Sequence, residues 1–122
     1  MCQDGYAITL AAVRGGQPLT FTLEIMNQES INIRLSALRA LLGNVPESLR
    51  AFSAEVSDGA IRLRSFFDES STDSDVELLS AAGTEIIADY PDSYTLEEDF
   101  WTLSKGSEMS HLSELVFLRH EL

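Results

Sequence analysis

The chain has 122 residues, 44% of them hydrophobic, and a formal net charge of −12 at pH 7. This length and hydrophobicity predict one folded domain with a core and exclude a disordered chain. The charge argues against direct binding to nucleic acid, because an acidic surface repels phosphates. It favours a basic protein partner or, more simply, solubility alone.

The only cysteine, Cys2, rules out an internal disulfide bond and fits a reducing compartment. No apolar run approaches the ~20 residues of a membrane span. The N-terminus has no basic region of the kind that opens a signal peptide. We therefore expect a cytoplasmic protein that makes no use of a membrane.

Two strands, residues 6–13 and 19–26, are expected first, because the second is rich in β-branched and aromatic residues. Gly15 and Gly16 would supply the positive φ angles of a hairpin turn between them. A phosphate-binding loop is the sharper alternative for these glycines, with only the glycine pair to support it. We therefore predict an extra N-terminal hairpin within residues 1–30.

Residues 31–42 are expected to form an amphipathic helix that ends before Gly43. Its apolar residues recur every three or four positions and are predicted to face the core: Ile31, Leu35, Leu38, Leu41 and Leu42. A second hairpin then joins residues 49–56 to 60–67 through Asp58 and Gly59, a pair typical of a type I′ turn. In that register Val56, Ala54 and Phe52 lie opposite Ile61, Leu63 and Ser65.

The clearest helix signal begins at Thr72, which can cap the helix together with Asp75, three residues later. Apolar residues then follow at helical spacing as far as Tyr90, and Pro91 ends the helix. Ile86 is predicted to be buried and Glu77 to face solvent. The first turn contains Asp73 and Asp75, where the helix dipole favours negative charge.

Two strands, residues 94–103 and 112–120, complete the chain, and the apolar run of the second predicts burial on both faces. The predicted order is ββ-α-ββ-α-ββ. It implies a single α+β domain with a mainly antiparallel sheet and two helices on one face. The opposite face would then carry polar side chains and one tryptophan: Arg62, Arg64, Glu97, Asp99 and Trp101.

Eleven acidic residues lie between Phe66 and Leu103, and no Lys or Arg occurs between Arg64 and Lys105. We expect two partner-binding patches in this stretch. The first gathers where a strand ends and the helix begins: Asp68, Glu69, Asp73 and Asp75. The second lies on the sheet: Glu97, Asp99 and Trp101. A tryptophan in such a place is more often a packing residue than an anchor, but tryptophan is enriched at interface centres.

Catalytic signals are poor. His111 and His120 have no spacing typical of a metal pair, and Cys2 lies in a terminal segment expected to fray. The run Asp73-x-Asp75-x-Glu77 lacks the central glycine of a calcium loop. We therefore predict no catalytic residue, no metal and no cofactor.

Several motifs resemble a family of small acidic bacterial proteins. They are LLGNVP (41–46), LRA (49–51), FFD (66–68), TEIIADYPD (84–92), LEE (96–98) and VFLR (116–119). The resemblance covers residues 31–120, and the first 30 residues depart from it. Family members include immunity proteins of contact-dependent growth inhibition (CdiI-type) systems.

The resemblance implies a stoichiometric inhibitor that binds the C-terminal domain of a cognate toxin in the cytoplasm. Such toxins are commonly nucleases with basic surfaces, and an acidic inhibitor can steer toward a basic cleft and cover it. The alternatives are an acidic module or nucleic-acid mimic directed at another basic protein, and a small enzyme.

Overall fold

A computed structural model describes the chain from Pro18 to Glu121. The elements are α1 (Pro18–Leu41), β1 (Leu49–Ser57), β2 (Ala60–Phe67), α2 (Asp73–Ile87), β3 (Thr95–Thr102) and β4 (Glu114–Leu118). The chain forms two compact units, residues 1–32 and residues 33–122, and the second contains the sheet. Two helices with a four-stranded sheet confirm the α+β class within this part of the chain.

The first helix corrects the prediction at the N-terminus. Residues 19–26, predicted as a strand, belong to α1, which begins at Pro18. Proline suits the first turn of a helix, because its fixed φ is already helical and its missing N–H has no helical partner there. Strand propensity is a weak signal that such context overrides. The other predicted strand, 6–13, and the predicted turn at Gly15 and Gly16 lie outside the described residues.

The hairpin of β1 and β2 has the predicted register, with Phe52 opposite Ser65, Ala54 opposite Leu63 and Val56 opposite Ile61. Its turn places Asp58 at φ 50° and Gly59 at φ 77°. Both positions of a type I′ turn need positive φ, which glycine adopts freely and aspartate tolerates. The sequence signal for this hairpin is therefore confirmed.

The sheet has the strand order β3-β2-β1-β4. β1 pairs antiparallel with both β2 and β4, whereas β3 pairs parallel with β2. A parallel pair needs a crossover long enough to return the chain, and α2 provides it. The sheet is therefore mixed, with two antiparallel pairings and one parallel pairing.

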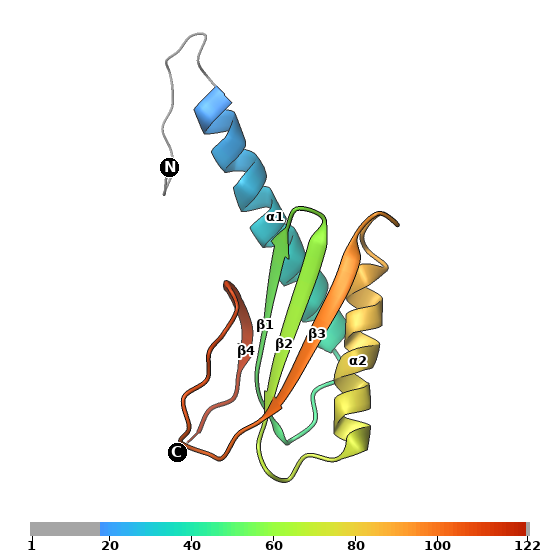
Figure 1. Cartoon of the computed structure of the whole chain (residues 1–122), viewed down its shortest axis with the longest axis vertical. Coiled ribbons are helices and arrows are strands. Elements are labelled where there is room, and N and C mark those ends of the chain that lie inside the picture. Colours follow the sequence, from blue (N-terminus) through green and yellow to red (C-terminus); the bar gives the residue numbers. More distant parts are fainter. Residues whose placement is uncertain (1–17, 122) are drawn as a thin grey trace. The chain divides into compact units, whose positions relative to one another are not determined.

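The core lies on one face of the sheet. Phe52, Ala54, Ile61, Leu63 and Phe67 point from that face and pack in one buried cluster with residues of both helices. Figure 1 shows the C-terminal part of α1 passing behind the strands and α2 beside β3. The opposite face carries no helix from the described part of the chain.

The second helix packs as predicted. Thr72 caps it, with Asp75 completing the reciprocal capping box, and Leu79, Ala82, Gly83 and Ile86 are buried. The helix ends at Ile87, three residues before the predicted end. A Cβ atom at Gly83 would collide with the carboxylate of Glu98 on β3. The missing side chain of Gly83 therefore leaves room for the Glu98 carboxylate beside α2.

The first helix packs with a different face from the one predicted. Ile33, Ala37, Ala40 and Leu41 are buried, whereas Leu35, Leu38 and Leu42 are exposed, as is Ile31. Of the five predicted core residues, only Leu41 faces the core. The buried face is made largely of small side chains, which allow the helix backbone to approach the sheet. Apolar residues occur on both faces, so periodicity alone could not choose between them.

Candidate functional site

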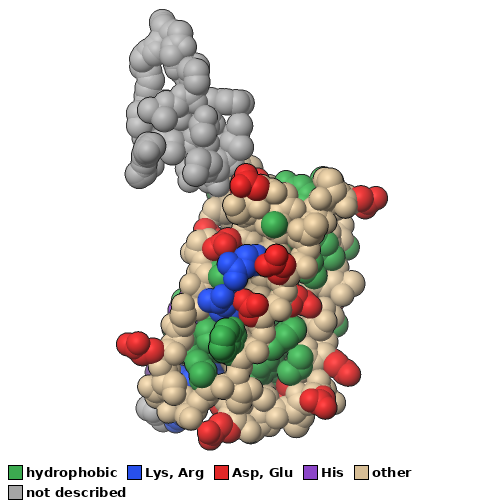
Figure 2. Space-filling view, in the orientation of Figure 1, with side chains coloured by type: hydrophobic (Ala, Val, Ile, Leu, Met, Phe, Trp, Pro, Cys, Tyr) green, Lys and Arg blue, Asp and Glu red, His purple; other side chains and the backbone are tan. Residues whose placement is uncertain are grey.

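The helix-free face of the sheet carries the second predicted patch. Parallel pairing sets Arg62 beside Glu97, Arg64 beside Asp99 and Phe66 beside Trp101. Across β1 the last of these rows continues through Ala51 to Leu118 of β4. Figure 2 shows basic side chains bordered by acidic ones on this face, with exposed hydrophobic side chains next to them.

Two arginines pair with three acids of this face. Arg62 lies 3.6 Å from Glu55, 3.6 Å from Glu97 and 3.4 Å from Asp99. Arg64 lies 3.0 Å from Asp99. Glu97 and Asp99, which we predicted to bind a partner, are therefore part of a cross-strand ion-pair ladder. Partly exposed pairs of this kind contribute little to stability, about 0–1 kcal/mol each.

The connection between β3 and β4 covers the middle of this face. The guanidinium of Arg64 donates to the carbonyl of Ser110 at 2.9 Å, and the N–H of Leu112 donates to the Ser53 hydroxyl at 3.0 Å. The ring of His111 meets the ring of Phe66 edge-on, with 5.8 Å between centroids. Phe66 is buried as a result.

Trp101 remains half exposed, at 49%. Its ring stacks on that of Phe66, with centroids 6.5 Å apart and planes inclined at 28°. The buried Phe66 ring thus limits the orientations that Trp101 can adopt. At the other end of the row, Leu118 and its neighbour Leu115 are also exposed. The predicted burial of the last strand on both faces is therefore wrong.

The parallel pairing of β2 with β3 joins the two predicted patches. Because parallel strands end at the same edge of a sheet, the residues after β2 lie beside those after β3. The Ser104 hydroxyl donates to Glu69 at 3.2 Å across this edge. Glu69, from the first patch, is therefore close to the end of β3 that carries Trp101.

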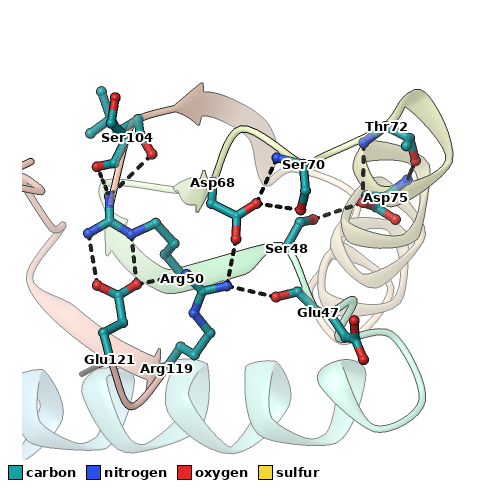
Figure 3. A network of polar contacts seen from close by, with 11 residues as sticks. Glu47, Ser48, Arg50, Asp68, Ser70, Thr72, Asp75, Ser104, Arg119 and Glu121 are labelled. Carbon is teal, nitrogen blue, oxygen red and sulfur yellow. Dashed lines mark hydrogen bonds and ion pairs between the residues drawn. The ribbon is translucent and has the colours of Figure 1, made fainter. Parts of the chain in front are cut away.

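Asp68, beside Glu69, belongs to a network that ties distant segments together (Figure 3). It accepts hydrogen bonds from the N–H and hydroxyl of Ser70, at 2.8 and 2.6 Å, and pairs with Arg119 at 2.8 Å. The bonds from Ser70 and then Arg119 lower the pKa of Asp68 to about 2. Its carboxylate is thus occupied within the fold.

The centre of this network is Arg50, whose side chain is 2% exposed. Its Nε and Nη2 atoms donate to the two carboxylate oxygens of Glu121 at 2.8 and 3.0 Å, a bidentate pair. Its Nη1 atom donates to the carbonyl of Ser104 at 2.9 Å. Glu121 also pairs with Arg119 at 2.9 Å, and the bonds from both arginines lower the pKa of Glu121 to about 2.

Sequence reasoning did not find this network. Arg50 looked like part of an apolar strand, and its partner Glu121 lies 71 residues further along the chain. The one available signal was that Arg50 is flanked by residues that proved to be buried. A buried arginine needs a carboxylate as its partner. That signal could not have said which of the acidic residues was the partner.

The remaining acids of the first patch differ in availability. Asp75 accepts hydrogen bonds from the Thr72 N–H and from the Ser48 hydroxyl, the latter at 2.8 Å. Asp73 and Glu69 are exposed, and neither pairs with a basic residue in the part of the chain that the structure describes. Among the seven predicted residues, Glu69, Asp73 and Trp101 are therefore exposed and form no ion pair within residues 18–121.

Within residues 18–121, no group of three or more His, Cys, Asp or Glu side chains is arranged to hold a metal ion. Over the same residues, no helix is long and apolar enough to cross a membrane. Trp101 is half exposed, and tryptophan is enriched at the centres of protein–protein interfaces. The fold is therefore that of a small α+β protein, and its chain is strongly acidic.

The chain belongs to the MafI2 immunity protein family, which matches residues 30–121. It is therefore a toxin-immunity protein, and members of such a family are inhibitors and not enzymes. A search of curated proteins finds no match. The resemblance to contact-dependent growth inhibition systems holds for the toxin-immunity class, while the family itself is of the Maf type.

Proposed function

We propose that this immunity protein neutralises its cognate toxin by binding the toxin's C-terminal domain one to one in the cytoplasm, and that this domain is a basic nuclease. The net charge of −12 supports a basic partner. A nuclease must attract phosphates, so its cleft carries positive charge that an acidic inhibitor can meet. Inhibition would then be by occupancy, which prevents the substrate from entering.

We assign the contact to Glu69, Asp73 and Trp101, which we call the strand-end surface. The observation that carries this proposal is the half-exposed Trp101 held on the buried Phe66 ring, at the edge where Glu69 also lies. A tryptophan whose ring is already oriented loses little conformational entropy on binding. Carboxylates without a basic partner in the same chain can pair with arginine or lysine of the toxin.

The acids and the tryptophan have different roles in this proposal. Exposed charges act at long range, so Glu69 and Asp73 raise the association rate above the ~10⁵–10⁶ M⁻¹s⁻¹ of uncharged pairs. Trp101 acts only at contact, so it slows dissociation. The Arg62 and Arg64 ladder contributes little attraction, because two arginines offset most of the charge of Glu55, Glu97 and Asp99.

The first experiment is a titration. The toxin is identified by copurification with the tagged chain, and its nuclease activity is measured against increasing inhibitor. One-to-one occupancy predicts a sharp break at an equimolar ratio. Slow protection by much less inhibitor than toxin would contradict occupancy.

The second experiment locates the surface by binding kinetics. Reversing Glu69 and Asp73 to lysine should slow association at low salt, with a smaller effect at high salt. The matched control reverses Glu85 and Asp92, which are also exposed but lie toward the other end of α2. Both double variants change the net charge from −12 to −8. Equal slowing by the two would mean that overall charge, and not this surface, steers the toxin.

The anchor has its own control. Trp101→Ala should raise the dissociation rate by about tenfold or more, as loss of an anchor worth at least ~1.4–2 kcal/mol requires. Leu118→Ala removes a similarly exposed side chain at the far end of the same row. If Leu118→Ala speeds dissociation as much as Trp101→Ala, the whole face binds the toxin and the strand-end surface is not the centre.

A further inference from the structure

Strand β3 lies at one end of the sheet, with β2 as its neighbour on one side. The Thr95 N–H donates to the carbonyl of Gly59, and the Leu103 N–H donates to the carbonyl of Phe67. Because the register does not shift between these bonds, odd-numbered residues of β3 face β2 and even-numbered residues face away. Within residues 18–121, the outward N–H and C=O groups have no hydrogen-bond partner. They belong to Leu96, Glu98, Phe100 and Thr102.

The two edges of the sheet differ in how well they could pair with a further strand. β4, at the other end, has five residues, and its pairing with β1 shifts register between Phe52 and Ser53. β3 has eight residues in unbroken register with β2. Short and irregular edges resist further pairing, whereas a long regular edge is a template for it. β3 is therefore the edge that can accept a strand.

The side chains of β3 select the kind of strand that fits. Glu97, Glu98 and Asp99 are consecutive, and β3 contains no Lys or Arg. A second copy of β3 would bring like charges opposite one another, which destabilises a strand pair. A strand that carries Lys or Arg would be stabilised at the same positions. The edge therefore disfavours a second copy of this chain and fits a basic protein segment.

Glu98 is the acid of β3 that forms no ion pair within residues 18–121. Its carboxylate lies beside α2, in the space left by the missing side chain of Gly83. The Ser80 hydroxyl donates to it at 3.4 Å. Burial raises the pKa of Glu98, and the bond from Ser80 offsets only part of that rise. A partly buried carboxylate without a cation is stabilised when a lysine or arginine arrives.

The side of α2 next to this edge is also acidic. Ser80 contacts Glu98 from α2. Asp73 and Glu77 precede Ser80 by seven and three positions, so all three lie on one side of the helix. Asp73 and Glu77 are exposed. Figure 1 shows α2 beside β3, and both elements belong to the unit of residues 33–122. The corner between α2 and the β3 edge therefore presents negative charge to a partner.

We propose that the toxin adds a β-strand to the edge of β3, and that this strand carries a lysine or arginine opposite Glu98. The inference rests on the proposed function, in which a basic toxin domain is the partner. The outward N–H and C=O groups of β3 bond to the toxin backbone, as they do when a peptide extends a sheet. Residues directly opposite on paired strands share a face, with Cβ atoms about 4.5–5.5 Å apart, so the basic side chain reaches the Glu98 carboxylate. Trp101 projects from the other face of β3, so one toxin strand meets both the edge and the anchor.

The first test is amide hydrogen exchange, measured residue by residue by NMR. The full chain is compared alone and in complex with the toxin domain that copurifies with it. In the unbound chain the outward amides of Glu98 and Phe100 should exchange faster than the amides of Glu97 and Asp99, which face β2. On binding, exchange at Glu98 and Phe100 should slow by at least about tenfold. Unchanged exchange at both in a complex whose toxin is inhibited would overturn strand addition and leave the proposed function in place.

The second test removes one outward N–H group. Phe100→Pro does so without removing a bond to β2, and proline is tolerated on that side of an edge strand. Phe100→Val is the matched control, because it loses the same ring and keeps the N–H. Phe100→Pro should bind the toxin domain about tenfold more weakly than Phe100→Val. Equal affinities of two folded variants would overturn the proposal. If Phe100→Pro loses the wild-type circular dichroism spectrum, the exchange test and Glu98→Gln decide.

Glu98→Gln keeps the size of the side chain and removes its charge. It should weaken toxin binding by about tenfold, because the basic residue loses its carboxylate. Glu85→Gln is the control, since Glu85 is exposed on another side of α2, and its affinity should stay within about twofold of wild type. An effect of Glu98→Gln no larger than that of Glu85→Gln would overturn the cation opposite Glu98. A chain that inhibits no toxin would overturn the proposed function and this inference with it.

Discussion

The sharpest prediction concerns Arg50, because its environment allows the cost of removing it to be worked out. In Arg50→Met the bidentate pair with Glu121 and the bonds to the β3–β4 connection are lost. Breaking a buried ion pair by removing one partner costs about 3–5 kcal/mol. Glu121 keeps its pair with Arg119 at 2.9 Å and is 20% exposed, so its charge is not stranded. We therefore expect a loss near the lower limit, about 3 kcal/mol.

The assay is urea denaturation, with the free energy of unfolding taken from the midpoint and slope. Arg62→Met is the control, because Arg62 is 38% exposed and its ion-pair distances are 3.4–3.6 Å. Its loss should stay below about 1 kcal/mol. Equal losses for the two variants would refute the reasoning. They would mean that burial does not determine how much each ion pair contributes to the free energy of unfolding. A loss below about 1 kcal/mol for Arg50→Met would refute it as well.

Two further predictions test the network and the core. The carboxyls of Asp68 and Glu121 have ordinary pKa values of 3.8 and 4.5, which the fold lowers to about 2. As the pH falls, the unfolded chain binds these protons before the folded chain does. The free energy of unfolding should therefore fall as the pH drops from about 4.5 toward 2. Asp68→Asn should weaken this pH dependence. In α2, Ile86→Ala should cost about 2–5 kcal/mol, because the side chain is fully buried. Glu77→Ala, on the exposed side of the same helix, should cost less than about 0.5 kcal/mol by the same measurement.

The Arg50 network also bears on function. It ties Glu121 and the carbonyls after β3 to β1, close to the edge that carries Trp101 and Glu69. The strand-end surface is thus supported by a buried ion pair and not by loop contacts alone. A surface that is rigid before binding loses less entropy when the toxin arrives.

Local signals in the sequence determined the elements whose geometry depends on near neighbours. Asp58 and Gly59 specify the β1–β2 turn, because both of its central positions need positive φ. Thr72 and Asp75 specify the start of α2 by satisfying each other's backbone N–H groups. Net charge and motif resemblance together pointed to a toxin-immunity protein, and the MafI2 family match confirms that class.

Tertiary structure alone decided which faces and which charges are available. The sequence could not choose the buried face of α1, because apolar side chains line both faces and only packing on the sheet selects the one with small residues. Nor could it show that β3 returns parallel to β2, which brings Glu69 and the Trp101 end of β3 to one edge. Most of the predicted binding acids proved to be engaged by partners far along the chain, such as Arg119, 51 residues from Asp68. Contacts at that separation follow from the fold as a whole, and no local pattern in the sequence encodes them.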